Sequence, residues 1–242
     1  MKTFYENWAQ KEILGDYPLR EKTLRWKARV FAHLIPEGWR FRTLLDVGCA
    51  EGILTDELSR LLKIDFSVGI DISANFIRIG RERGKTIQFV QNDGTLPFKS
   101  RFFDLTICSD FIEHVPDISK YLDEIRRVSR FILFKVPIES CLVGNLLRAV
   151  GIYPRSGTDH PSGHLHLFSK KSARDVIENN GFSVISLSFE ITPLTILYPN
   201  VSKFRVFLNP FTYLGLFSRF AFPRWFIPLL GGNLFAFAGS EK

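Results

Sequence analysis

The sequence is poor in cysteine and has no paired cysteine motif. Its three cysteines, Cys49, Cys108 and Cys141, are widely spaced, and no two of them form a CxxC pair. An odd number with this spacing favours neither a disulfide framework nor a zinc knuckle. We therefore expect a protein of the reducing cytoplasm in which Cys49 and Cys108 are small core residues.

Long uncharged apolar runs are also lacking. The first residues, MKTFYENWAQKEILGDYP, contain no apolar core of signal-peptide length, and their acidic residues are atypical of a transit peptide. We expect this stretch to stay in the mature protein. In the Phe-rich region 192–232, charged residues and prolines interrupt every apolar run before it reaches the roughly 20 residues that cross a bilayer. No transmembrane helix is predicted.

The overall composition is that of a packed globular protein. Of the 242 residues, 45% are hydrophobic and 24% are charged, which argues against disorder and allows one sizeable core. The net charge of +7 is compatible with nucleic acid, an anionic membrane surface or an acidic substrate. The basic residues are scattered and no nucleic-acid module is visible, so no nucleic-acid partner is expected. The composition does not predict an oligomeric state.

Short apolar runs alternate with segments of helical periodicity. Leu54, Leu58, Leu61 and Leu62, for example, share one face of a helix that follows the run TLLDV. Strands alternating with helices predict an α/β fold whose largely parallel sheet has helices on both faces. The expected strands are 43–47, 66–71, 86–93, 102–110, 130–137 and 182–191, the last of them near an edge.

Two segments interrupt this alternation and divide the chain. We expect an N-terminal helical cap at 1–40, a core at 41–191 that contains an active-site loop at 138–168, an insertion at 192–232 and a last strand at 233–242. The insertion mixes Phe with Lys203, Arg205, Arg219 and Arg224. This mixture suits an interfacial helix pair on an anionic membrane or a lid over a lipid-like substrate. Packing on the sheet or on a second subunit is the alternative.

Acidic residues end the first three expected strands. Asp46, Asp71 and Asp93 would point into one crevice at the carboxyl edge of the sheet, where such folds bind ligands. Asp at such positions can also serve local hydrogen bonding alone. Three in succession favour a ligand that is cationic or rich in hydroxyl groups. Glu51, between Gly48 and Gly52, would repel a pyrophosphate, and a P-loop Lys is missing. A carboxylate at the tip of the second strand suits a ribose.

The motifs resemble those of class I S-adenosylmethionine-dependent methyltransferases. LLDVGCAEG is similar to the acid-x-Gly-x-Gly-x-Gly signature, and VGIDIS, QNDGTLPF and FFDLTICSDFIEHV follow in the family's order. GHLHLFSKKSARDVIENNGF resembles the small-molecule branch, which includes the ubiquinone-biosynthesis methyltransferases. The resemblance covers about residues 40 to 190. It implies a Rossmann-like, seven-stranded, mostly parallel sheet with an antiparallel last strand, and S-adenosyl-L-methionine as cofactor.

The resemblance also implies a cofactor site. The backbone around Gly48 and Ala50 would contact the methionine part of the cofactor, and Asp46 would support its ammonium group. Asp71 would hold the ribose, and Ile72 would pack on the adenine. The full set implied is Asp46, Gly48, Ala50, Gly52, Asp71, Ile72, Asp93, Gly94 and Ser109. Asp93 and the Gly94 backbone would receive the adenine amino group. Ala50 replaces the middle glycine of the signature, and we expect weaker binding rather than none.

Histidines supply the candidate catalytic groups. His114, directly after Glu113 at the end of the fourth strand, is the first candidate for a general base if the acceptor is a hydroxyl. It could equally bond only to backbone. His164 is a second candidate base or substrate contact, with His166 on the same side and Leu165 inward.

The histidine-rich loop was also considered as a metal site. Asp159, His160, His164 and His166 carry suitable donor atoms. Their spacing matches no standard metal motif, so a polar, substrate-facing loop is predicted and no metal is expected.

The sequence is therefore interpreted as a methyltransferase for a small or lipid-linked acceptor, with oxygen as the methylated atom. It would be cytoplasmic, with a possible peripheral site on the membrane through 192–232. Two rivals stay open. One is a non-catalytic membrane-surface or partner-binding module on the same fold, and the other is a nicotinamide-dependent oxidoreductase.

Overall fold

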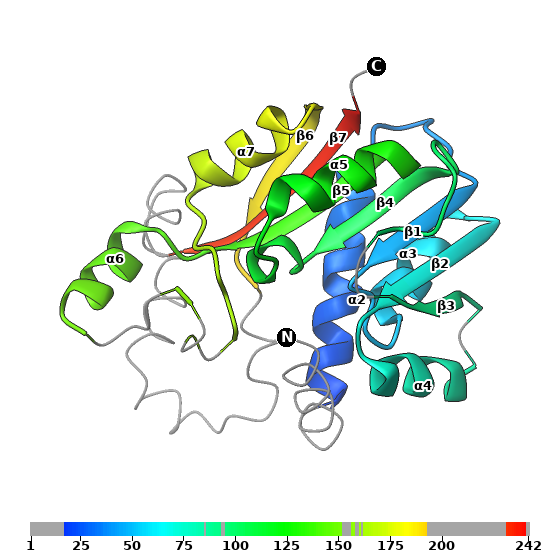
Figure 1. Ribbon diagram of the computed structural model, residues 1–242, viewed down its shortest axis with the longest axis horizontal. Helices are drawn as coiled ribbons and strands as arrows, with labels where there is room; N and C mark the ends of the chain where they lie inside the picture. Colours follow the sequence, from blue (N-terminus) through cyan, green and yellow to red (C-terminus); the bar gives the residue numbers. More distant parts are fainter. Residues whose placement is uncertain are drawn as a thin grey trace.

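The chain forms a central sheet with helices on both faces (Figure 1). The computed structural model describes residues 17–84, 86–92, 95–151, 156–157, 160, 162–192 and 231–240. Its elements, in chain order, are α2 (Tyr17–Leu34), β1 (Thr43–Val47), α3 (Ile53–Leu62), β2 (Phe66–Asp71), α4 (Ala74–Glu82), β3 (Gln88–Gln91), β4 (Phe103–Ser109), η1 (Ile112–His114), α5 (Ile118–Val128), β5 (Ser129–Ile138), α6 (Leu142–Ala149), α7 (Lys170–Asn179), β6 (Phe182–Glu190) and β7 (Gly232–Ser240).

The sheet has seven strands in the order β3-β2-β1-β4-β5-β7-β6. The five strands from β3 to β5 are parallel, and β7 lies between β5 and β6, antiparallel to both. The predicted mostly parallel sheet, its antiparallel last strand and the edge position of β6 are confirmed. Since the parallel strands share one carboxyl edge, the loops that follow β1, β2, β4 and β5 lie along the same side.

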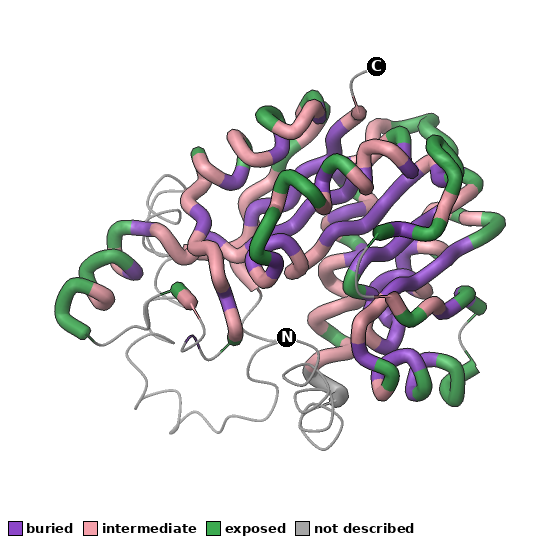
Figure 2. Tube along the Cα trace, in the orientation of Figure 1, coloured by how far each residue is buried: buried purple, intermediate pink, exposed green. Residues whose placement is uncertain are grey.

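Different helices cover the two faces of the sheet (Figure 1). Leu122 and Ile125 of α5 and Ile177 of α7 are buried on one face. On the other, Phe31 of α2 packs against Phe235 of β7, with ring centroids 5.1 Å apart. Leu58 of α3 is buried in the same cluster. The predicted periodicity locates the buried side of α3 at Leu54 and Leu58, whereas Leu61, predicted on the same face, is 37% exposed. Figure 2 shows buried strands beneath helices whose outer sides are exposed.

The segment predicted as one long loop, 138–168, contains a helix. α6 begins after Cys141 and extends away from the sheet, and Leu142, Leu146 and Val150 are 61–64% exposed. The helix is short and has glycines nearby, so its hydrophobic periodicity is too weak to predict it from the sequence. Of the expected domains, the first 16 residues and most of the 192–232 insertion lie outside the described residues. In the described part of the chain, no helix has both the length and the hydropathy to cross a bilayer.

Candidate active site

The loop after β1 turns through three residues with left-handed backbone. Gly48, Ala50 and Gly52 have φ of 80°, 49° and 76°. A Cβ on Gly52 would lie 2.3 Å from Cδ1 of Ile87, and one on Gly48 would lie 3.0 Å from Cδ2 of Phe111. Both glycines are therefore required by conformation and by space, whereas Ala50 adopts a conformation that is unfavourable for its side chain.

Asp71, at the end of β2, connects this loop to the next helix. Its carboxylate accepts hydrogen bonds from the backbone N–H groups of Ala50 and Ser73, both at 2.8 Å. Burial raises the pKa of Asp71, and the two backbone hydrogen bonds oppose that effect. Asp71 and Ile72 are only half-buried. A glycine turn beside a half-buried carboxylate and an apolar side chain fits the ribose and base of a nucleoside.

Asp46 occupies a different environment from the open crevice that the sequence predicts. Its side chain is buried and accepts a hydrogen bond from the Thr55 hydroxyl of α3. Burial raises the pKa of Asp46 to about 7. It therefore lies below the loop, bonded to the following helix, where a nearby cationic group would favour its ionised form. Asp93 and Gly94 lie outside the described residues, so their predicted adenine contacts stay predictions.

Basic residues of α2 contact the acids of this edge, which the sequence analysis missed. Arg20 donates from Nε and Nη2 to the two carboxylate oxygens of Glu51, at 2.7 and 2.9 Å. Lys27 donates to Asp110 at 2.5 Å. Glu51 is thus neutralised by a partner that lies 31 positions away, so no local motif could reveal the pair.

Asp110 is held between two lysines at the end of β4. Lys27 and Lys135 both pair with its carboxylate. Burial alone would raise the pKa of Asp110, but the two ammonium groups outweigh it and hold that pKa well below its usual range. Ser109, a predicted cofactor contact, donates its hydroxyl to the same carboxylate at 3.0 Å. This cluster joins α2, β4 and β5 beside the cofactor loop.

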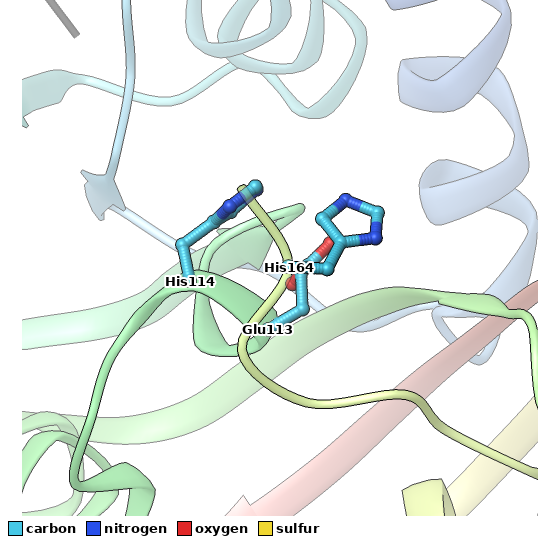
Figure 3. A group of neighbouring side chains, drawn as sticks. All are labelled: Glu113, His114 and His164. Atoms are coloured by element: carbon cyan, nitrogen blue, oxygen red, sulfur yellow. The ribbon is translucent and has the colours of Figure 1, made fainter. Parts of the chain in front are cut away.

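The two candidate bases, His114 and His164, lie next to each other. Their ring centroids are 4.9 Å apart. The backbone carbonyl of Glu113 accepts from the N–H groups of Leu165 and His166, at 2.7 and 3.2 Å, which brings the later loop to η1. One donor atom from each of Glu113, His114 and His164 lies within 4.8 Å of the others. Figure 3 shows the three side chains gathered in one place.

Burial keeps two members of this group uncharged. Both carboxylate oxygens of Glu113 are buried with no hydrogen-bond partner among the described residues. Burial, followed by the charge of Asp110, raises the pKa of Glu113 to about 8. Burial and the neighbouring His164 lower the pKa of His114 to about 4. At neutral pH these values correspond to a protonated Glu113 and a neutral His114.

A second carboxylate, Glu139, contacts the same loop from the end of β5. Its Oε2 lies 2.6 Å from Nδ1 of His164. The ring of His160 stacks on His164 with centroids 4.6 Å apart. The prediction that Leu165 points inward is wrong, because Glu139 draws His164 into the buried position and Leu165 stays half-buried. His166 faces elsewhere and contacts the carbonyl of Val115 at 2.9 Å.

The described residues include two sets of three donors that could hold a metal ion. These are Glu113 with His114 and His164, and Glu139 with His160 and His164. The spacing in the sequence predicts no metal, but these donors come from segments far apart in the chain. Asp159, the other potential donor of the histidine-rich loop, lies outside the described residues. The geometry therefore leaves a metal open as an alternative to proton transfer.

Comparison with known proteins identifies the half of the sheet that contains the glycine loop. Residues 45–130 match the family described as "Methyltransferase domain". This segment is therefore similar to methyltransferase domains. The predicted family is thus confirmed for the segment that carries the loop, Asp71 and the β4 motif.

Similar proteins extend this result. A ubiquinone biosynthesis O-methyltransferase of Pectobacterium atrosepticum is 32% identical over 87 residues, which are 34% of this chain and 35% of that protein. The first curated relatives are matched over only 34–39% of their own length. A complex of the Haloferax volcanii Trm112 methyltransferase activator with a putative methyltransferase has a TM-score of 0.71 at 16% identity, covering 98% of this chain and 96% of that one.

A third similar protein bears on the cofactor. Magnesium protoporphyrin IX methyltransferase of Synechocystis, solved with bound S-adenosylhomocysteine, has a TM-score of 0.60 at 16% identity and covers 99% of each chain. At this identity the likeness shows a shared fold. The methyltransferase domain and this neighbour agree with the predicted cofactor, S-adenosylmethionine.

Proposed function

We propose that the protein transfers a methyl group from S-adenosylmethionine to a small-molecule or lipid-linked acceptor, at oxygen. The observation that carries this proposal is the glycine loop joined to the half-buried Asp71, within the segment that matches the methyltransferase domain. When bound, the cofactor supplies an electrophilic methyl group on a good leaving group, so the protein contributes mainly proximity and orientation.

Different residues would bind different parts of the cofactor. Asp71 would accept hydrogen bonds from the ribose hydroxyls, and Ile72 would pack on the base. Gly48 and Ala50 would present backbone to the methionine part. Asp46, whose raised pKa marks a site that favours a compensating cation, would support the ammonium group through the loop above it. Arg20 stabilises the same loop by neutralising Glu51.

Oxygen as the methylated atom is supported by the group at the end of β4 and β5. A hydroxyl acceptor loses a proton during transfer, and His114 and His164 offer imidazole nitrogens that could accept it. Phe111, whose ring approaches Gly48 of the cofactor loop, lies three positions before His114. The relative from Pectobacterium atrosepticum is named as an O-methyltransferase. Both points favour oxygen over nitrogen or carbon.

The proposal also specifies that the acceptor is lipid-linked and lies at an anionic membrane surface. The Phe-rich, basic composition of 192–232 supports it, as does the exposed apolar row of Leu142, Leu146 and Val150 on α6. In this proposal the protein is cytoplasmic and peripheral to the membrane, and both segments contact the lipid surface.

Isothermal titration with S-adenosylmethionine, S-adenosylhomocysteine and NAD tests the cofactor. Micromolar binding of the first two is expected, and Asp71→Ala should weaken it about 100-fold, since charged hydrogen bonds to two hydroxyls are lost. Asp65→Ala, which removes an exposed carboxylate bonded to Arg42, is the matched control. Binding of NAD alone would favour the oxidoreductase. Binding of none would favour the non-catalytic module.

Flotation with anionic and zwitterionic vesicles tests the membrane part. We expect binding to the anionic vesicles, reduced by deletion of 193–230 and by Leu146→Glu. Leu61→Glu on α3 introduces the same charge at another exposed leucine, 37% accessible, and should bind as the unaltered protein does. Equal flotation of all variants would exclude this surface. Methylation of lipid extracts then separates an enzyme from a binding module.

A further inference from the structure

We infer that Glu139 is a positioning residue that makes His164, rather than His114, the group that accepts the proton of a hydroxyl acceptor. The inference rests on the proposed methyl transfer to oxygen. It identifies the group that accepts the proton of the acceptor hydroxyl. Sequence reasoning placed His114 first and gave Glu139 no role. The contacts around the two rings reverse that order.

The Glu139 carboxylate determines which nitrogen of His164 carries the hydrogen. A carboxylate only accepts, so at 2.6 Å the Nδ1 of His164 must be the donor. In the neutral ring Nε2 then carries the lone pair. A carboxylate on the opposite nitrogen also stabilises the imidazolium that forms when Nε2 takes a proton. The geometry therefore prepares His164 as a base.

Both partners are held by backbone. Glu139 follows β5 directly, and its N–H donates to the carbonyl of Phe168 at 3.1 Å. The N–H of Leu165, next to His164, donates to the Glu113 carbonyl at 2.7 Å. His160 stacks on the His164 ring with an interplanar angle of 14°. The His164 side chain is 11% exposed, so few alternative rotamers are open to it.

His114 has a weaker arrangement for the same task. Its Nδ1 lies 3.2 Å from the carbonyl of Gly163, a neutral partner. Other groups around His164 are Glu113 and His160, with Asp110 and its two lysines beyond Glu113. Among the described residues, Glu139 is the only carboxylate hydrogen-bonded to the His164 ring.

The proton step balances with these groups. The acceptor O–H proton passes to Nε2 of His164 while the oxygen forms its bond to the methyl carbon. The electron pair of the broken carbon–sulfur bond remains on sulfur, which becomes a neutral thioether. The His164 imidazolium, stabilised by Glu139, later releases its proton to water, so one proton leaves for each methyl group transferred.

The first experiment determines the tautomer of His164 by nitrogen NMR spectroscopy of protein whose histidine ring nitrogens are isotopically labelled. The chain has five histidines, so single His→Gln variants assign the signals. We expect His164 to carry its hydrogen on Nδ1, and Glu139→Ala to give a mixture of tautomers. Glu139→Asp retains a carboxylate, which can only accept, and should retain the tautomer. The exposed His33, bonded to the Arg29 carbonyl, is the internal control.

An Nε2–H tautomer in the unaltered protein, or a tautomer unchanged in Glu139→Ala, would overturn the inference. S-adenosylhomocysteine titration of each variant shows whether it is folded. This reading needs no turnover, so the positioning is decided even if the proposed acceptor class fails.

The second experiment measures methyl transfer to a soluble catechol, 3,4-dihydroxybenzoic acid. We expect His164→Gln to lower kcat at least 100-fold with little change in KM, Glu139→Gln to lower it about 10-fold, and His114→Gln to lower it less. A larger loss in His114→Gln than in His164→Gln would contradict the assignment. A metal site would be indicated instead of a base if a chelator abolished activity and Mn²⁺ restored it. In that case Mn²⁺ should also broaden the NMR signals of His114 and His164.

Discussion

The loop after β1 and the segment after β4, which contains η1, lie along the same edge of the sheet, but the carboxylates of the two segments have different surroundings. Around the first loop, Asp71 accepts from two backbone N–H groups, Asp46 accepts from Thr55, and Glu51 pairs with Arg20. At the second, the Glu113 carboxylate is buried with no hydrogen-bond partner among the described residues. The carboxylates around the first loop are hydrogen-bonded, whereas the second segment has a buried carboxylate that is not hydrogen-bonded within the described part of the chain.

This difference matches the proposed division of labour. A cofactor that binds in every turnover is served by a loop whose conformation is satisfied before binding. The proposed base, His164, lies beside Glu113 of the second segment but is held by Glu139. The following substitutions test how far each loop depends on its own conformation, its charges and its partners.

The largest effect is expected from Gly52→Ala. The left-handed backbone and the 2.3 Å approach to Ile87 leave no room for a Cβ. We expect the free energy of unfolding to fall by about 2–5 kcal/mol, combining backbone strain and overpacking. Gly84→Ala is the matched control: its φ is +64° with nothing within 4 Å, and about 1 kcal/mol is expected. Equal losses in urea unfolding would contradict the packing argument.

Next in size is the pH dependence of Asp46. Because its pKa is raised to about 7 in the folded state, the folded protein binds this proton more tightly than the unfolded chain does. The resulting stability is full below about pH 4 and is lost as pH rises to about 7. Asp46→Asn should therefore match the unaltered protein at pH 4 and exceed it by about 2–4 kcal/mol at pH 8. Asp65→Asn is the exposed control. If the free energy of unfolding of Asp46→Asn differed from that of the unaltered protein by the same amount at every pH, the prediction would be refuted.

A smaller effect is expected for the pair of Arg20 and Glu51. Glu51 is 3% and Arg20 19% exposed at the side chain, so the two hydrogen bonds are little screened. A double-mutant cycle with Arg20→Ala and Glu51→Gln should give a coupling of about 1–3 kcal/mol. The exposed pair Arg78 and Glu82, 60% and 59% accessible, should give at most about 0.5 kcal/mol. Similar couplings would mean that α2 does not stabilise the loop.

The smallest effect concerns Ala50, the departure from the methyltransferase signature. Its φ of 49° favours glycine. Ala50→Gly should raise the melting temperature, corresponding to about 1 kcal/mol, and should bind S-adenosylhomocysteine at least as tightly. Gly48→Ala is the reverse change in the same loop and should be destabilising. A lower melting temperature for Ala50→Gly would show that the alanine methyl group contributes packing.

Sequence reasoning succeeded where the relevant residues are neighbours in the chain. The run around Asp46, Gly48 and Gly52 was interpretable because one strand, one turn and one helix start contain it. Ser73 caps the start of α4, and its hydroxyl accepts a hydrogen bond from the Phe76 N–H. Periodicity likewise located the buried side of α3 at Leu54 and Leu58. In these places the local conformation is decided by residues within a few positions.

It failed where partners meet through the fold. Glu139 and His164 are separated by 25 positions, and Lys27 and Asp110 by 83. Nothing local distinguishes Lys27 from the other basic residues of its helix. α6 was missed because eight residues within a loop rich in glycine carry little periodic signal. The alternation pattern predicted Leu165, not His164, to point inward. It failed because it cannot include Glu139, which follows β5 and contacts His164 only in the folded protein.

By itself, the sequence determined the order of strands and helices, the glycine turn and the acids at the strand ends, because hydrophobic periodicity and backbone preference act over a few residues. The tertiary structure alone decided which of these acids is neutralised, which is buried and which histidine faces a carboxylate. Those properties depend on desolvation and on partners from distant segments, and both exist only once β4, β5 and α2 are packed together.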